Sequence, residues 1–152
     1  LRRGRAAAAT PRRTLHVVAV VAPRPQRPSA GGGLVDPEVY TKVTAGVYGL
    51  YAAQFLLTPE KLSNDHFDEK TTALSTFLSR GSGLAWGAVV YGLWCLSPKI
   101  EAVVALNALC GLLYPWNAKF GLLTDIKVKY PMHYFPEVLF AGLVGAGIMA
   151  MN

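Results

Sequence analysis

Long apolar blocks separated by short charged ones run from Val35 to the end of the chain. The intervals without Asp, Glu, Lys or Arg cover residues 43–59, 81–98, 102–118 and 138–152. Each interval is close to the length of about 20 residues that crosses a bilayer. Neither the 3.6-residue period of an amphipathic helix nor the alternation of a strand stands out, which is typical of helices with apolar surroundings. The pattern predicts helices at about 39–57, 72–96, 100–116 and 135–151.

Turn-forming residues mark the boundaries of these segments. Pro59 closes the first, Ser97-Pro98-Lys99 separates the second from the third, and Pro131 and Pro136 bracket the start of the fourth. The short turn at Pro98 requires an antiparallel hairpin. The sequence thus predicts an all-α membrane protein, an antiparallel bundle of four transmembrane helices. Two alternatives remain: a soluble all-α protein with a very apolar core, or a third and fourth segment lying partly in the membrane interface.

The bulk composition favours lipid over water as the surroundings. Of the 152 residues, 52% are hydrophobic and 16% are charged, and the mean hydropathy is +0.30. Soluble domains carry about 25% charged residues. The net charge of +6 is concentrated at the N-terminus, where seven of the fifteen basic residues precede Asp36, the first acidic one. The rest of the chain is nearly neutral, so nucleic acid is not an expected partner.

The first 33 residues have the composition of an organelle-targeting leader. They are rich in Arg, Ala, Pro and Gly and contain no Asp or Glu, as plastid and mitochondrial transit peptides do. A secretory signal is the alternative, because residues 15–22 form a short apolar run, although eight residues are too few to span a bilayer. We therefore expect a leader at 1–33, most simply a plastid transit peptide, and a transmembrane domain at 34–152.

Loop charges and aromatic residues give the expected topology. More lysines fall in the two longer loops than beside the chain ends and the Pro98 turn, which places the long loops in the stroma, matrix or cytosol. Tyr40 and Trp94 are expected in an aromatic belt at one membrane face. The opposite belt would hold Tyr114, Trp116, Tyr130 and Tyr134.

Small residues recur four apart on three of the predicted helices, where they would allow close packing in lipid. We expect these stripes to pack within the bundle or against partner subunits. They comprise Ala45, Gly49 and Ala53 on the first helix, Gly83 and Gly87 on the second, and Ala141 and Gly145 on the fourth.

Few polar groups lie within the predicted spans. Arg80 would snorkel to the interface, or anchor an anionic lipid or an acidic residue of a partner. Gln54 and Asn107 would form hydrogen bonds between helices, or supply an oxygen ligand to the magnesium of a chlorophyll. His133 is a further candidate pigment ligand. His66, beside acidic residues in a loop, is expected to be solvated, without the fixed spacing of a metal site.

Motifs of catalysis are missing from the sequence. It contains no GxxxxGK[ST], no GxGxxG, no CxxC and no HExxH, and no carboxylate lies in the middle of a span. A non-enzymatic role is therefore expected. A small carrier or membrane enzyme remains as an alternative, and it would require a polar cavity that joins Gln54, Arg80 and Asn107.

Residues 48–87 (YGLYAAQFLLTPEKLSNDHFDEKTTALSTFLSRGSGLAWG) contain a TPE turn, a DHF loop and an R-G-x-G step. This stretch resembles the first half of small four-helix algal membrane proteins, which are similar to accessory subunits of photosystem and antenna assemblies. The resemblance implies a structural or linker subunit in the thylakoid membrane, in contact with lipids and other membrane subunits. Chlorophyll and carotenoid would lie at the subunit interfaces. An accessory subunit in the mitochondrial inner membrane is the alternative.

The chain departs from light-harvesting antenna proteins themselves. Their ligand pattern of Glu, then Asn or His, then Arg has its nearest match at Glu101 to Asn107, and no Arg follows there. We therefore expect a neighbour of antennae and not an antenna.

Overall fold

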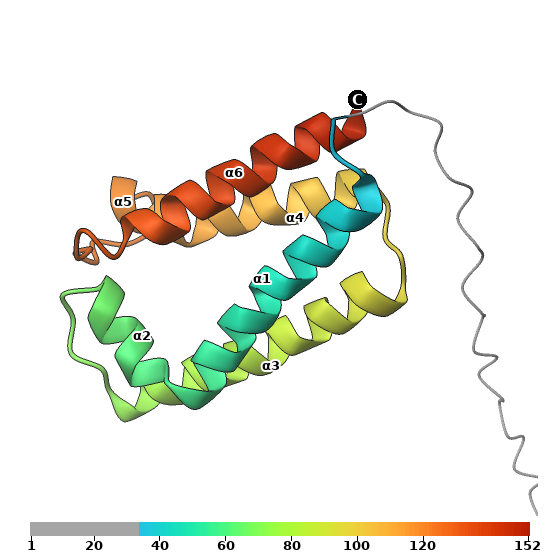
Figure 1. Cartoon of the computed structure of the whole chain (residues 1–152). Helices are drawn as coiled ribbons and strands as arrows, with labels where there is room; N and C mark the ends of the chain where they lie inside the picture. The colour runs from blue at the N-terminus through green and yellow to red at the C-terminus, as the bar shows by residue number, and fades with distance from the viewer. Residues whose placement is uncertain (1–33) are drawn as a thin grey trace, which may run out of the picture.

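The computed structural model describes residues 34–152, so the expected leader at 1–33 lies outside the described residues. The described part folds entirely into helices and loops, apart from an isolated β-bridge between Phe67 and Val128. Four helices are long and two are short (Figure 1). They are α1 (Pro37–Leu57), α2 (Pro59–His66), α3 (Ala73–Cys95), α4 (Ile100–Leu113), α5 (Pro115–Phe120) and α6 (Tyr134–Met151). The prediction of an all-α fold is confirmed.

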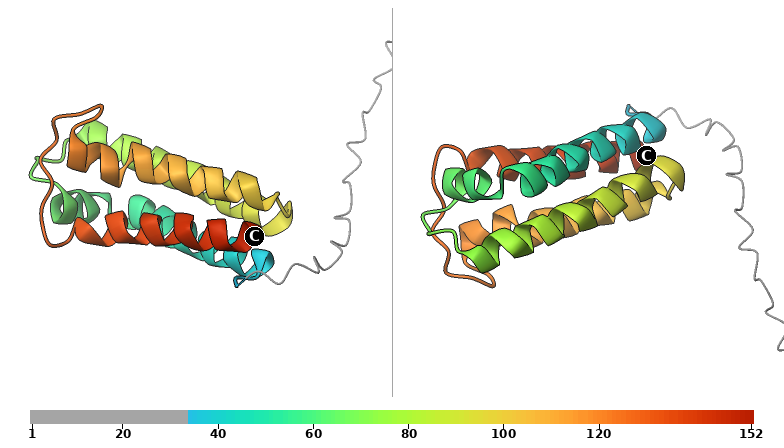
Figure 2. Two further views of the ribbon diagram at one scale, coloured as in Figure 1. Left: turned by 90° about the horizontal axis from the view of Figure 1, so that it is seen from above. Right: turned by 90° about the horizontal axis from the view of Figure 1, so that it is seen from below.

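The long helices form two pairs. α1 packs along α3, α4 packs along α6, and α1 also contacts α6 and α4. Consecutive long helices run in opposite directions, as Figures 1 and 2 show. The short helices α2 and α5 lie at one end of the bundle, while the start of α1, the turn between α3 and α4, and the end of α6 lie at the other.

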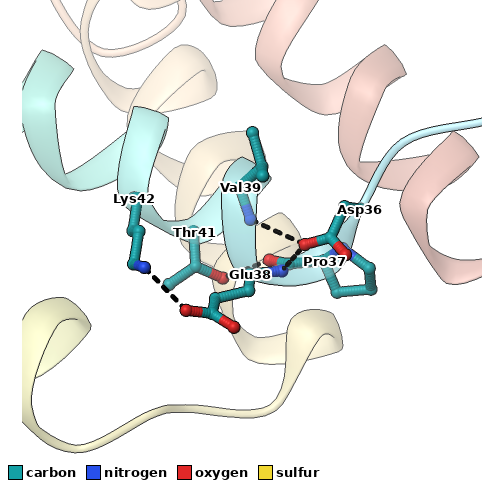
Figure 3. Close-up of polar contacts among 6 residues, drawn as sticks. All are labelled: Asp36, Pro37, Glu38, Val39, Thr41 and Lys42. Carbon is teal, nitrogen blue, oxygen red and sulfur yellow. Dashed lines mark hydrogen bonds and ion pairs between the residues drawn. The ribbon is translucent and has the colours of Figure 1, made fainter. Parts of the chain in front are cut away.

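Local chemistry fixes the start of α1 (Figure 3). The Asp36 carboxylate accepts hydrogen bonds from the backbone N–H groups of Glu38 and Val39, at 2.8 and 2.9 Å. These N–H groups have no partner inside the helix, so the side chain satisfies them. Pro37 occupies the first turn, where its missing N–H costs nothing. Lys42 adds an exposed ion pair to Glu38 one turn away.

The third predicted helix is shorter than expected. α4 ends at Leu113, and Pro115 begins the separate helix α5. A proline N has no hydrogen to donate and its ring clashes with the preceding turn, so the helix cannot continue through it. The prediction of one helix over 100–116 was therefore wrong at its C-terminal end. At its other end, Ser97 takes a left-handed backbone conformation (φ 44°), which allows the tight turn from α3 into α4.

The helices differ in how well they match a bilayer. At 1.5 Å per residue, α1 and α3 are about 32 and 35 Å long, α6 about 27 Å and α4 about 21 Å. The hydrocarbon core is about 30 Å thick. Among the described helices, α6 alone combines the length and apolar composition of a membrane span.

Small residues allow close approach at specific points. Ala45 is buried, and a Cβ on Gly83 of α3 would lie 3.0 Å from the backbone oxygen of Ala52 on α1. The tightest contact is Gly147 on α6, where a Cβ would lie 2.5 Å from both the Tyr40 hydroxyl and a methyl group of Val104. The sequence stripe on α6 pointed instead to Ala141 and Gly145.

The other stripe residues do not pack closely within the chain. Ala53, Gly87 and Ala141 are exposed, and a Cβ on Gly87 or Gly145 would meet nothing within 4 Å. A Cβ on Gly49 would approach only a methyl group of Val90 on α3, at 4.0 Å. Apart from Gly49, these residues lie on helix faces that turn away from the neighbouring helix. Packing against partner subunits stays a prediction for them.

A substitution at Gly147 tests the closest helix contact. We expect Gly147→Ala to lower the free energy of unfolding by about 1–3 kcal/mol, because the added methyl group overpacks the site. Gly142→Ala on the same helix is the matched control, since a Cβ there meets nothing within 4 Å. Thermal unfolding of both variants in detergent measures the difference, and equal stability would show that α6 does not approach Tyr40 closely.

Candidate functional site

The two long loops are joined at the end of the bundle that holds α2 and α5. The backbone N–H of Asp68 donates to the Lys127 oxygen, and the Lys129 N–H donates to the His66 oxygen, both at 2.8 Å. The Lys129 ammonium also donates to the Asn64 oxygen at 3.1 Å. This pairing brings residues far apart in the sequence into one cluster.

Two histidines meet in that cluster. His66 is the last residue of α2, and His133 directly precedes α6. Their ring centroids lie 5.8 Å apart in an edge-to-face arrangement, and their side chains are buried (6% and 0% exposed). The ring Nε2 of His133 lies 3.2 Å from the Pro115 oxygen. Within the described residues, the Nδ1 atoms of both histidines lack a hydrogen-bond partner.

Aromatic rings enclose the histidine pair. The rings of Phe67, Tyr114 and Tyr130 lie 5.5–6.2 Å from His133, centroid to centroid. Burial lowers the pKa of His66 below its ordinary value, and His133 adds to this effect, while Asp65 partly opposes it. Burial beside His133 therefore favours the neutral form of the His66 imidazole. The expectation that His66 is a solvated loop residue was wrong, because the second loop covers it.

An ion pair lies beside the histidines and ties α5 to α6. The Lys119 ammonium lies 2.5 Å from one oxygen of Glu137, and the Tyr130 hydroxyl donates to the other at 2.9 Å. The Glu137 side chain is buried (7% exposed), while Lys119 remains partly exposed. The hydrogen bond with Glu137 raises the pKa of Lys119. Sequence reasoning missed this group, since its members lie 7 and 18 residues apart.

A second polar group lies in the middle of the bundle. The Asn107 side chain on α4 is fully buried and accepts a hydrogen bond from the Tyr48 hydroxyl at 2.8 Å. Its amide nitrogen donates to the hydroxyl oxygens of Tyr40 and Thr44, at 2.7 and 3.3 Å. The α1 residues are four apart, so their side chains share one face of the helix. The amide thereby links α1 to α4.

The network corrects one expectation and refines another. Tyr40, expected in an interface belt, is 3% exposed and points to Asn107. Asn107 bonds between helices, which was one of its two expected roles. Gln54 and Arg80 are exposed and lie apart from this network. Pigment ligation by His133, Asn107 or Gln54, and anchoring by Arg80, stay predictions.

The small number of metal-ligating side chains limits the chemistry available at the histidine pair. A closed structural zinc site uses four ligands. Among the described residues, no group of three or more His, Cys, Asp and Glu side chains is placed to hold a metal ion. Within the described residues, the pair offers a ligand two ring nitrogens without a hydrogen-bond partner, its Nδ1 atoms. Comparisons with protein-family models, curated proteins and solved structures found no match to this chain.

The Asn107 network predicts a cost for removing its amide. We expect Asn107→Leu to lower the free energy of unfolding by about 1–3 kcal/mol, because three buried hydroxyl groups lose their partner. Gln54→Leu is the matched control, since that amide is exposed. Thermal unfolding in detergent measures both variants, and an equal effect would contradict the role assigned to Asn107.

The lowered pKa of His66 predicts a pH dependence. The unfolded chain takes up a proton at His66 near its ordinary pKa of 6.5, whereas the folded chain does so only at lower pH. Stability should therefore fall as the pH falls through about 6.5. We expect His66→Asn to reduce this slope in thermal unfolding measured from pH 8 to pH 5. An unchanged slope in the variant would show that His66 is not buried as described.

Proposed function

We propose that this chain is a membrane protein with four spanning helices, acting as a non-catalytic structural or linker subunit of a photosynthetic complex in the thylakoid. The observation that carries the proposal is the outward surface of α3. Of its 23 residues, Gly83 and Leu93 are the buried ones. The others include large apolar side chains that face away from the chain. They are Leu74, Phe77, Leu78, Leu84, Tyr91 and Trp94.

Apolar surface of this extent is unfavourable in water and favourable against lipid or another membrane subunit. The remaining long helices have similar outward residues, including Val43 and Leu50 on α1, Leu109 on α4 and Val138 on α6. The Asn107 side chain and its hydroxyl partners on α1 are instead turned inward. Apolar side chains outside and satisfied polar groups inside are expected of a bundle in a bilayer.

The arrangement of the long helices supports a four-span topology. An antiparallel order puts the α1 start, the Pro98 turn and the α6 end at one face, and the paired loops at the other. The short α4 would reach that second face through α5, which follows it directly. In this proposal Tyr130, Tyr134 and Lys119 lie at the membrane interface near the paired loops.

The outward small residues support a linker role over a carrier role. Ala53, Gly87 and Ala141 offer close approach to a neighbouring subunit, which in lipid favours helix association. A carrier would require Gln54, Arg80 and Asn107 around one polar cavity. In the described residues, the first two are exposed and the third is buried and hydrogen-bonded. The thylakoid location rests on the leader composition and on the resemblance of residues 48–87.

Separation of solubilised membranes tests the assignment. Organelle membranes are dissolved in mild detergent, complexes are separated on a density gradient, and the chain is located by mass spectrometry. Comigration with a chlorophyll-bearing photosystem band is expected, with chlorophyll and carotenoid at its interfaces. Comigration with respiratory complexes would instead support the mitochondrial alternative. Migration as a small colourless species would contradict a subunit role.

A bulky residue at Gly87 tests the partner contact. We expect Gly87→Leu to leave the stability of the isolated chain within about 0.5 kcal/mol, because nothing lies within 4 Å of its Cβ position. The same variant should shift the chain from the large complex to lighter gradient fractions. Gly46→Leu on α1, which is equally open, is the control for added bulk. Full retention of the Gly87 variant in the complex would exclude this face as a subunit interface.

A further inference from the structure

The helices α3 and α4 follow one another through a short turn, yet they make only sparse contact because α3 packs on α1 and α4 on α6. Two hollows lie in the space between them. A cavity of about 110 Å³ lies beside Trp86 of α3 and Cys110 of α4. An apolar groove of about 330 Å³ begins at Val89 and Leu106 and extends to the Pro98 turn. On α3, Val89 lies three residues after Trp86, and on α4, Leu106 lies four residues before Cys110. The two hollows are therefore about one helical turn apart.

The cavity has flat aromatic walls. Trp86 stacks on Tyr48 with ring centroids 4.6 Å apart and planes only 8° from parallel. Further rings come from α1, α6 and the end of α4, and the non-aromatic lining includes Ser82 and Cys110. The remaining aromatic lining residues are Tyr51, Phe55, Tyr114 and Phe140. Aromatic walls favour a planar, unsaturated ring as a guest through stacking and edge-to-face contacts.

One buried hydroxyl in the lining lacks a hydrogen-bond partner within residues 34–152. The Tyr51 side chain is 8% exposed, and its hydroxyl has no hydrogen-bond partner among the described residues. A buried hydroxyl without a partner is costly, and nearly all such groups in folded proteins are satisfied. The neighbouring Tyr48 hydroxyl differs, because it already donates to Asn107. The buried Tyr51 hydroxyl can therefore donate to a guest with an acceptor oxygen.

We propose that this cavity binds the ring of a prenylated benzoquinone, with the Tyr51 hydroxyl donating to a quinone carbonyl and the apolar tail lying in the groove toward the Pro98 turn. The cavity of about 110 Å³ is smaller than the apolar cavity of about 150 Å³ that holds benzene, so it takes one six-membered ring at most, with the ring's substituents extending toward the groove. It is too small to enclose the macrocycle of a chlorophyll. A flat quinone ring also stacks on a flat aromatic wall better than the puckered end ring of a carotenoid does.

The fluorescence of Trp86 reports directly whether the cavity is occupied. The chain has three tryptophans, and the variant Trp94→Phe/Trp116→Phe leaves Trp86 as the sole fluorophore. The purified full chain in detergent is titrated with 2,3-dimethyl-1,4-benzoquinone carrying a decyl chain, and quenching of Trp86 is measured. Saturable quenching is expected, since the ring would lie against the indole. The measurement needs no partner subunit, so its outcome is independent of the gradient separation above.

Three variants in this background locate the site. Tyr51→Phe removes only the hydroxyl and should weaken binding about five-fold, the value of one hydrogen bond. Ser82→Leu places bulk on an exposed lining position and should weaken binding about ten-fold or more. Ala88→Leu is the matched control, since it is exposed on the same helix outside both hollows, and its binding should be unchanged.

Each alternative outcome is also informative. Non-saturable quenching that is equal in all variants would show partition of the quinone into detergent only and would overturn the proposal. Unchanged binding in Tyr51→Phe would show that the Tyr51 hydroxyl does not donate to the quinone. Solvent extraction of the chain purified from native membranes, followed by mass spectrometry, is expected to yield a prenylquinone. Extraction of a keto-carotenoid or of acyl lipid in its place would also overturn it.

Discussion

The fold depends on one buried amide. Asn107 uses its oxygen and both amide hydrogens on side chains of α1, and the helix pairs α1/α3 and α4/α6 are joined around it. In apolar surroundings a polar group without partners is costly, so the amide fixes which face of α4 turns to α1. Tyr40 then determines the position of α6, because its hydroxyl lies where only a glycine, Gly147, leaves room.

The two ends of the bundle are closed by different means. At one end, Ser97 and Pro98 make the turn between α3 and α4. At the other, longer loops need tertiary contacts, which come from the backbone pairing beside Phe67 and from the Lys119–Glu137 ion pair. Open space remains between α3 and α4, because α3 packs mainly on α1 and α4 packs mainly on α6.

Much of the local structure could be predicted from the sequence. The ends of α1, α3 and α6 were placed within about two residues, because prolines and short polar stretches interrupt strongly apolar runs. The break at Pro115 was missed, since the apolar run continues through it to Ala118. The short helix α2 was also missed, because it has only eight residues, most of them polar, and the second loop, which covers His66, supports it.

The candidate site was less accessible to sequence reasoning. Asn107 and His133 stood out as polar residues in or near apolar segments, but their partners lie far away in the chain. Tyrosine was especially ambiguous, because an amphipathic ring suits a membrane interface as well as a buried hydrogen bond. Tyr40 and Tyr51 are polar groups of the interior, and only the packing of α1 against α4 and α6 reveals this.

The sidedness of two loop residues tests whether α3 spans a membrane. Single cysteines are introduced at Lys70, before α3, and at Lys99, after it, in a variant with Cys95 and Cys110 replaced. Sealed membrane vesicles are treated with a maleimide that cannot cross the bilayer. If α3 crosses the bilayer, only one of the two positions is labelled until the vesicles are permeabilised. Labelling of both positions from the same side of intact vesicles would contradict a membrane-spanning α3 and the four-helix topology built on it.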